Sequence, residues 1–389
     1  MTDPLQVPAQ HDAAAAPTNH ASRPRLPGLD VTRAVALIGV VILNYHGYLN
    51  NIDERAHMSL AERIFDPHQG PLGTRFAAVF VMVAGMGVTL MTNRSRQAGH
   101  ASAIRDDRWR LARRGLLLYA GGLLLEWVWP GTILFYYGAL FMVASLLFTL
   151  RLRWIALVGA VSSLAAAGVA WFEFERVTTG HSVAWLNPKV TSPRNLLLRT
   201  FVGYTHPLFP WLALLCVGIA VGRFLPLAKR LRLQIIAVGM TLLAGTYLLN
   251  HFGVQAATGH LAVPDTAAQR WALLLSTRPF DRGLLYTLGT IGSSLIAFCV
   301  VSWVADRTGR SWPVRILQHA GQMTLTLYVG HALVFNAVVH WWHWVGPTGL
   351  DTALVFALIF WVYSISLAAL WHRYLGAGPL ERVYRGFGG

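Results

Sequence analysis

The chain has 389 residues, of which 54% are hydrophobic and only 13% are charged. Soluble domains carry about 25% charged residues, so this composition excludes an ordinary water-soluble enzyme. Basic residues outnumber acidic ones, giving a formal net charge of +15. The two cysteines, Cys216 and Cys299, both lie in apolar runs, so the sequence offers neither a disulfide framework nor a cysteine zinc site.

The first segment, residues 1–25, is rich in Ala, Pro and Thr and has no apolar stretch of signal-peptide length. We expect a disordered cytoplasmic tail there, followed by a single transmembrane domain over 26–389. That domain contains apolar runs of about 20 residues, each long enough to cross a hydrocarbon layer roughly 30 Å thick. The predicted fold class is an all-α polytopic membrane protein of about ten spans: 30–50, 72–93, 111–129, 131–150, 154–174, 207–225, 233–250, 283–303, 322–343 and 351–371.

Basic residues divide unequally between the two sides of these predicted spans. The N-terminal tail, the even-numbered connections and the C-terminal segment carry 21 Lys and Arg, against 10 in the longer opposite loops. Seven of the 21 lie in the predicted loop 94–114. Because Lys and Arg stay on the cytoplasmic side, both termini are predicted to be cytoplasmic, in a multi-pass protein of the cell membrane. The basic excess then needs no nucleic-acid partner.

The start of the first span combines Asp30 with Arg33, which lies within the apolar run. A buried arginine in a span is costly and is usually paired or lines a wet cavity. Asp30 lies one helical turn before Arg33 and could pair with it. One interpretation is a snorkelling arginine with a capping aspartate at the inner interface; the other is a cationic site that receives phosphates from the cytoplasm. Asn44 lies 11 residues further on, roughly 16 Å along a helix and near the outer side.

Several short motifs resemble the heparan-alpha-glucosaminide N-acetyltransferase family and its bacterial YeiB-like relatives. Leu29-Asp30-x-x-Arg33 followed by Asn44-Tyr45 resembles the opening span of that family, and Phe80 to Gly87 resembles its second span. The remaining matches are Pro207-Leu208-Phe209-Pro210-Trp211, Gly321-Gln322-Met323-Thr324-Leu325 and Gly378-Pro379-Leu380-Glu381. Leu325 to His331, with Tyr328, also resembles a Tyr-Leu-x-His element of this group and of the separate acyltransferase-3 family.

The resemblance implies transfer of an acetyl or other acyl group from a cytoplasmic acyl-CoA to an extracytoplasmic acceptor. It also implies a catalytic histidine in the first outer loop, shortly before the second span. That loop contains His57 and His68, and His68 stands nearest the expected place. Imidazole suits the task, because its pKa near 6.5 lets it accept a proton at neutral pH or carry the acyl group itself. The alternative is a solvated loop histidine.

The expected site roles follow from these matches. Arg33 with Asp30 is expected to bind the acyl-CoA donor, and Asn44 to assist His68 in catalysis. The residues expected to bind the acceptor are His206, His46 and Tyr45. The acceptor itself, a sugar amine or hydroxyl, another glycan or a small molecule, is left open by the sequence.

Two other functions compete with an acyltransferase. A transporter or lipid flippase would use Arg33, Asn44 and His331 along a substrate path, and a non-catalytic membrane partner is the third alternative. No metal is expected, because the sequence has no HExxH, Cys-x-x-Cys or phosphate-binding Gly-x-x-x-x-Gly-Lys motif. Membrane lipid is an expected partner, and the sequence leaves a homodimer open.

Overall fold

The computed structural model describes residues 26–49, 58–186, 189, 192–203, 205–259, 265–309, 311–346 and 349–388. Within these ranges the chain is helical between its turns and contains no strand, as the composition predicted. The predicted disordered tail, residues 1–25, and the loop histidine His57 lie outside the described residues.

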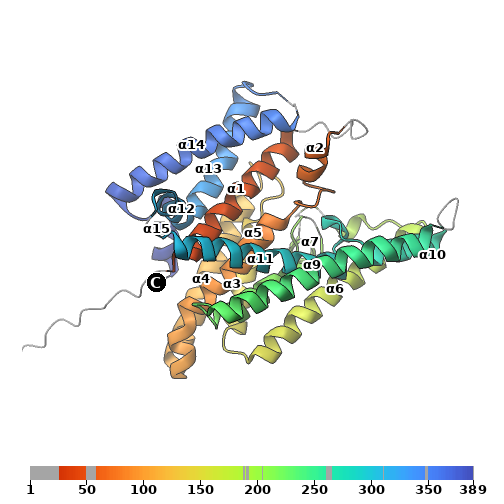
Figure 1. Cartoon of the computed structure of the whole chain (residues 1–389), viewed down its shortest axis with the longest axis horizontal. Coiled ribbons are helices and arrows are strands. Elements are labelled where there is room, and N and C mark those ends of the chain that lie inside the picture. Colours follow the sequence, from red (N-terminus) through yellow and green to blue (C-terminus); the bar gives the residue numbers. More distant parts are fainter. Residues whose placement is uncertain are drawn as a thin grey trace, which may run out of the picture.

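The helices follow one another in the order labelled in Figure 1. They are α1 (Pro27–Leu49), α2 (Leu60–Phe65), α3 (Arg75–Ala98), α4 (Ala101–Leu125), α5 (Leu134–Leu147), α6 (Leu152–Thr178), η2 (Ala184–Leu186), α7 (Pro193–Phe201), α8 (Leu208–Gly222), α9 (Lys229–Thr258), α10 (Thr266–Leu274), η3 (Pro279–Asp281), α11 (Leu284–Arg307), α12 (Trp312–Gln322), α13 (Thr324–Phe335), the π-helix η4 (Asn336–Trp341), α14 (Leu350–Leu375) and α15 (Pro379–Gly388).

Six of the described helices are long and apolar enough to cross a membrane: α1, α3, α6, α9, α11 and α14. A seventh candidate is the pair α12 and α13 with η4, which meet at a bend of 80°. Helices α5 and α8 are apolar but have only 14 and 15 residues. The chain therefore has the helical, membrane-spanning character that was predicted, with six to seven spans supported by helix length and apolarity.

The predicted loop 94–114 is wrong, because nearly all of it is helical. Helix α3 continues to Ala98 and ends at Gly99, whose positive φ of 71° and N–H bond to Ser95 close the helix. Helix α4 begins two residues later, at Ala101. Its arginines had suggested a solvated connection, but an i,i+3 ion pair between Asp107 and Arg110 (2.9 Å) accommodates charge on a helix.

Glycines let the helices approach closely at two crossings. A Cβ on Gly218 of α8 would lie 1.9 Å from the carbonyl oxygen of Met82 on α3. A Cβ on Gly321 of α12 would lie equally close, at 1.9 Å, to the carbonyl oxygen of Asp30 on α1. In membrane helices, small residues let the two backbones come into direct contact. The second contact fixes the end of α12 against the charged end of α1.

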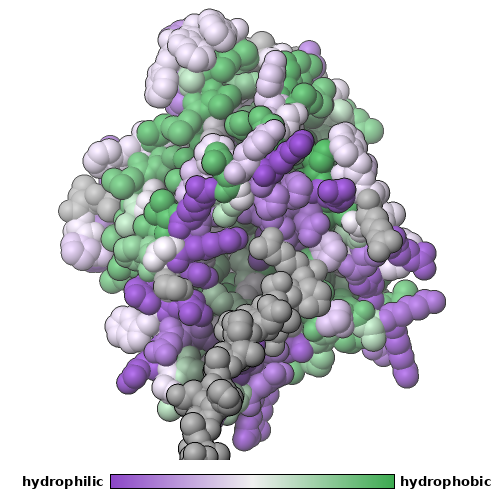
Figure 2. Space-filling view, turned by 90° about the vertical axis from the view of Figure 1, so that its left-hand side faces the viewer, coloured by the Kyte–Doolittle hydropathy of each residue, from purple (hydrophilic) through white to green (hydrophobic). Residues whose placement is uncertain are grey.

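Helix α1 is central to the bundle, since it packs against α3, α11, α12, α13 and α14. Its neighbours come from both halves of the sequence, so residues far apart in the chain meet along it (Figure 1). Figure 2 views the end of the molecule that carries α15, where hydrophilic residues surround a hollow and apolar residues predominate in the upper part of the view. Any side chain that α1 turns inward therefore lies at a junction of several helices.

Candidate functional site

A cavity of about 880 Å³ opens between α1, α3, α4, α5, α12, α13 and α15. Most of its wall is apolar, with side chains such as Leu37, Phe80 and Leu118. Its charged residues come from three helices: Asp30 and Arg33 from α1, Arg114 from α4, and Glu381 and Arg385 from α15. A cavity of this size with an apolar wall and a few charged groups is typical of a small-molecule site.

Asp30 and Arg33 form the ion pair that their spacing predicted. Arg33 Nη1 lies 3.3 Å from Asp30 Oδ1, and the Asp30 side chain is 13% exposed against 29% for Arg33. Gln322, the last residue of α12, donates to the other oxygen of Asp30 at 3.0 Å. Asp30 thus joins α1 to α12, while the Arg33 guanidinium lines the cavity.

Helix α15 closes one side of the cavity and is fixed by Glu381. Both carboxylate oxygens of Glu381 accept bonds at the start of α13, from Leu325 N (2.7 Å), Thr326 N (3.1 Å) and Thr326 Oγ1 (2.6 Å). A carboxylate is favourable there, because the first N–H groups of a helix have no partner within it. Three residues later Tyr384 lines the cavity, and burial raises the pKa of its hydroxyl to about 12.

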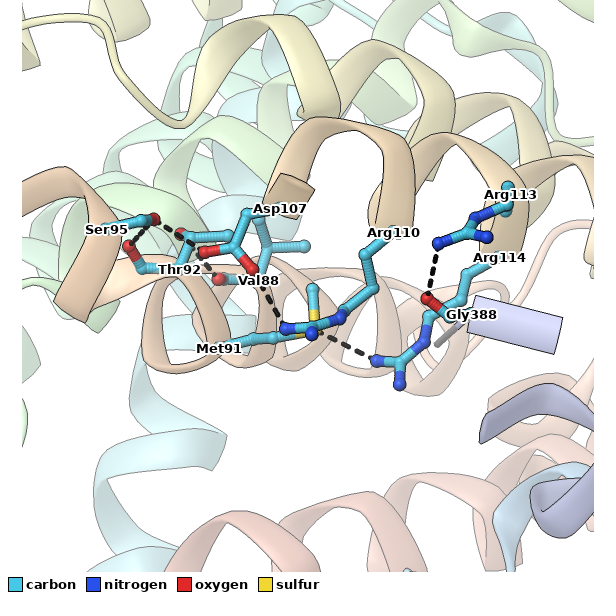
Figure 3. Close-up of polar contacts among 9 residues, drawn as sticks. All are labelled: Val88, Met91, Thr92, Ser95, Asp107, Arg110, Arg113, Arg114 and Gly388. Atoms are coloured by element: carbon cyan, nitrogen blue, oxygen red, sulfur yellow. Dashed lines mark hydrogen bonds and ion pairs between the residues drawn. The ribbon is translucent and has the colours of Figure 1, made fainter. Parts of the chain in front are cut away.

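Beside α15, the end of α3 and the start of α4 are joined by a polar cluster (Figure 3). Asp107 is 8% exposed and accepts from Ser95 Oγ at 2.6 Å and from Arg110 at 2.9 Å. Arg113 donates to the carbonyl oxygen of Gly388 on α15 at 3.3 Å. This cluster holds α4 in register with α3 and presents its next arginine, Arg114, to the cavity.

Asn44 and His331 meet where α1 crosses α13. Asn44 Nδ2 lies 3.1 Å from His331 Nε2, and His331 is fully buried. Tyr45 donates from its hydroxyl to the His331 carbonyl oxygen at 3.1 Å. The other ring nitrogen, His331 Nδ1, contacts the carbonyl oxygen of Tyr328. Since a carbonyl only accepts, Nδ1 carries the proton and Nε2 accepts from the Asn44 amide.

Tyr328 connects this pair to the cavity. Its side chain lines the cavity, and its hydroxyl lies 3.1 Å from both Thr132 Oγ1 and Ile133 N. His331 follows one helical turn later, with the ring of Trp129 at 5.2 Å between centroids. The pair of Asn44 and His331 therefore lies directly behind one wall of the cavity.

His68 lies on the surface, in the turn before α3. Asp66 fixes this turn, since its Oδ1 accepts from the backbone N–H groups of His68 (2.8 Å) and Gln69 (3.2 Å). The exposed imidazole lies against Phe280, with ring centroids 5.3 Å apart. The turn also covers the end of α1, where a Cβ on Gly47 would meet Pro67 at 3.0 Å.

The two other predicted histidines lie in separate surroundings. His46 is fully buried, and neither of its ring nitrogens has a hydrogen-bond partner among the described residues. His206 precedes α8, with its ring 4.7 Å from Trp211 and 6.1 Å from Tyr136 between centroids. Burial lowers the pKa of His206 to about 3, so its imidazole is neutral at physiological pH.

The structure thus brings some of the predicted residues together and leaves others apart. Asp30 pairs with Arg33, and Asn44 and Tyr45 share the partner His331. His68 lies against Phe280, and His206 lies against Trp211. His331 was missing from the predicted site, although the resemblance of Leu325 to His331 to a Tyr-Leu-x-His element had pointed to it.

Comparison with known families agrees with these motifs. A family model described as heparan-alpha-glucosaminide N-acetyltransferase, catalytic, matches residues 25–253, more than half of the chain. The chain belongs to this family. A second model, described as a protein of unknown function (DUF418), matches residues 252–387. No curated protein matches the chain significantly.

Membership in the heparan-alpha-glucosaminide N-acetyltransferase family makes the chain a membrane acyltransferase at the level of its class. The two family models match different residues of the site. The first covers Asp30, Arg33, Asn44 and His68, whereas the second covers α13 and α15, with His331 and Glu381. Both matched parts line the same cavity.

Proposed function

We propose that the protein moves an acetyl or other acyl group from a cytoplasmic acyl-CoA to an extracytoplasmic acceptor, such as a sugar amine or hydroxyl. The observation that carries this proposal is the cavity of about 880 Å³, with charged residues from α1, α4 and α15 and a mostly apolar wall that includes Tyr328. Its volume and mixed polarity suit a donor with an anionic nucleotide and a less polar arm.

In this proposal the chain crosses the cell membrane ten times, with both termini in the cytoplasm. Helices α4, α5 and α8 add three spans to the seven candidates. The excess of basic residues at the connections on the α15 side supports this orientation, because Lys and Arg favour the cytoplasmic face. The donor then enters beside Arg33 and the acceptor arrives from the side of His68.

The reaction itself is an acyl transfer from sulfur to nitrogen or oxygen. The acceptor attacks the thioester carbonyl, the carbon–sulfur bond breaks, and CoA leaves as a thiolate. We propose that His68 takes the proton of the acceptor, or carries the acyl group before the acceptor arrives. Asn44 donates a hydrogen bond to the carbonyl oxygen as negative charge develops on it.

His331 has a positioning role in this scheme. Its Nε2 accepts one N–H of the Asn44 amide (3.1 Å), which fixes the amide orientation and leaves the second N–H for the carbonyl oxygen of the substrate. His206, His46 and Tyr45 stay as proposed acceptor-binding residues. Of these, Tyr45 touches the site directly through its bond to the His331 carbonyl oxygen.

The test is an assay with purified protein in vesicles and acetyl-CoA labelled in its acetyl group. Label should reach a glucosamine-type acceptor on the opposite side of the vesicle membrane, and only when protein is present. A transporter would instead move an unmodified substrate across the membrane and leave acetyl-CoA intact.

A further inference from the structure

Two cavity arginines, Arg114 on α4 and Arg385 on α15, have no carboxylate within ion-pair distance among the described residues. The two carboxylates of the cavity are engaged elsewhere. Asp30 binds Arg33 and Gln322, and Glu381 binds the start of α13. Within the part of the chain that the structure describes, the cavity therefore holds two guanidinium groups without an ion-paired carboxylate.

The hydrogen-bond partners that the described residues offer to Arg114 are neutral: the Met91 thioether and the Tyr384 hydroxyl. Arg114 Nη1 lies 2.9 Å from the thioether sulfur of Met91, a weak acceptor, and its guanidinium lies 5.0 Å from the centre of the Tyr384 ring. The buried Nε has no partner among the described residues. Figure 3 shows this guanidinium beside Met91, whereas Asp107 pairs with Arg110.

Arg385 and Arg114 line the same cavity, so their positive charges share one enclosed space. The fold keeps them together all the same, because Glu381 anchors α15 to α13 and Arg113 binds the last turn of α15 at Gly388. Like charges held in one cavity are stabilised by an anion that both of them contact. Guanidinium groups suit phosphate in particular, which they bind through paired N–H donors.

We propose that Arg114 and Arg385 form a phosphate clamp, one half on α4 and the other on α15, that binds the phosphate groups of the acyl-CoA nucleotide. This inference rests on the proposed function for the identity of the ligand. It gives the C-terminal helix a defined role, since the donor site is incomplete without α15. Arg33 of α1 is already paired with Asp30. In this proposal it lies beside the arm of the donor, and the clamp holds the nucleotide.

Binding measurements on the purified full-length protein in neutral-lipid nanodiscs test this clamp. Three probes separate its parts: acetyl-CoA, adenosine 3′,5′-bisphosphate, and acetyl-pantetheine, which lacks phosphate. Arg114→Gln and Arg385→Gln should each weaken acetyl-CoA and bisphosphate binding by about 10-fold or more, as expected for a lost charge-assisted hydrogen bond. Acetyl-pantetheine binding should not change.

Matched controls come from the same two helices. Arg105→Gln on α4 and Arg382→Gln on α15 remove exposed arginines outside the cavity, and both should keep wild-type affinity. Arg114→Lys keeps the charge but loses the fork of donors, so its affinity should fall between those of wild type and Arg114→Gln. Melting temperatures of all variants identify any that fail to fold.

The outcomes separate the clamp from the proposed function. If wild-type protein binds acetyl-CoA and Arg114→Gln and Arg385→Gln bind it equally well, the clamp is wrong and the proposed function stands. If wild-type protein binds none of the three probes, the proposed donor is wrong as well. If the two variants lose binding of phosphatidic acid in mixed nanodiscs while retaining that of acetyl-CoA, the arginines serve a lipid phosphate and the clamp as proposed is wrong.

Discussion

Asn44 of α1 and His331 of α13 are separated by 287 positions in sequence and by 3.1 Å between Nδ2 and Nε2 in the structure. The Tyr328 carbonyl oxygen fixes the tautomer of the histidine, and the histidine in turn orients the amide. This hydrogen-bond relay runs from the Tyr328 carbonyl oxygen through the His331 ring to Asn44. It fixes the orientation of the Asn44 amide behind the wall of the cavity.

The relay predicts that Asn44 and His331 act as one unit. Asn44→Ala should lower acyl transfer by up to about 10² to 10³ fold, the usual loss for an oxyanion donor. His331→Ala should lower the rate less, with CoA affinity unchanged, because it only orients the amide. In the double variant the loss should not exceed that of Asn44→Ala alone.

Steady-state rates and CoA affinities of the two single variants and the double variant measure the coupling between Asn44 and His331. His340→Ala, which removes an exposed histidine from the adjoining π-helix, is the control and should stay at the wild-type rate. If the rate losses of the two single variants multiply in the double variant, His331 works independently of Asn44.

Arg33 should support the donor at the cavity. Because it lines the cavity and pairs with Asp30 at 3.3 Å, Arg33→Ala should weaken acetyl-CoA binding by roughly 10-fold. Arg105→Ala, an exposed α4 arginine outside the cavity, should have no effect. Titration of purified protein with acetyl-CoA measures both, and equal affinities in the two variants would leave Arg33 as a topological anchor only.

Glu381 should be needed both for stability and for the donor site. Glu381→Ala leaves the Leu325 and Thr326 N–H groups without their carboxylate and should destabilise the fold by about 1 to 3 kcal/mol. Freed from its anchor, α15 should also bind acetyl-CoA more weakly.

Thermal unfolding with and without acetyl-CoA tests both effects. Glu381→Gln, which keeps an amide oxygen for the two N–H groups, should recover part of the stability. An alanine variant with wild-type stability and affinity would contradict the anchoring role.

The orientation of the chain predicts opposite labelling of two engineered cysteines. Cys216 and Cys299 are buried, so background labelling by an impermeant maleimide should be low. Cysteine at exposed Gln69, beside His68, should react only from outside, and cysteine at exposed Ala101 only from the cytoplasm. Labelling of intact and inverted vesicles measures this, and the reverse pattern would overturn the proposed topology.

The sequence predicted best what depends on local spacing. Apolar runs located the membrane helices, and the i,i+3 spacing of Asp30 and Arg33 predicted their ion pair. The family resemblance was also predicted, and the family match confirms it. The charge pattern predicted the helix ends less well. The arginines in 94–114 suggested a loop, whereas α3 ends at Ala98 and α4 begins at Ala101.

Tertiary contacts could not be predicted from spacing. Nothing local to Asn44 indicates His331, and nothing local to Arg114 indicates that α15 folds back over it. The bend of 80° between α12 and α13 likewise lies between two distant contacts, that of Gly321 with Asp30 and that of Leu325 with Glu381. All of these pairs are distant in sequence, and those of Asn44, Arg114 and Asp30 join the two matched parts of the chain, so only the assembled fold shows them.

The most direct measurement of the central claim is acyl transfer across a vesicle membrane, with labelled acetyl-CoA supplied only on the Arg33 side and an amino sugar only on the His68 side. Wild-type protein should produce labelled acetylated sugar on the His68 side. His68→Ala should lower that rate by about 10² to 10⁴ fold while acetyl-CoA binding stays nearly intact, as expected for a general acid-base residue. Product formed by His68→Ala at the wild-type rate would remove His68 from the mechanism, and no transfer by folded, CoA-binding wild-type protein to any amine or hydroxyl acceptor would contradict the account as a whole.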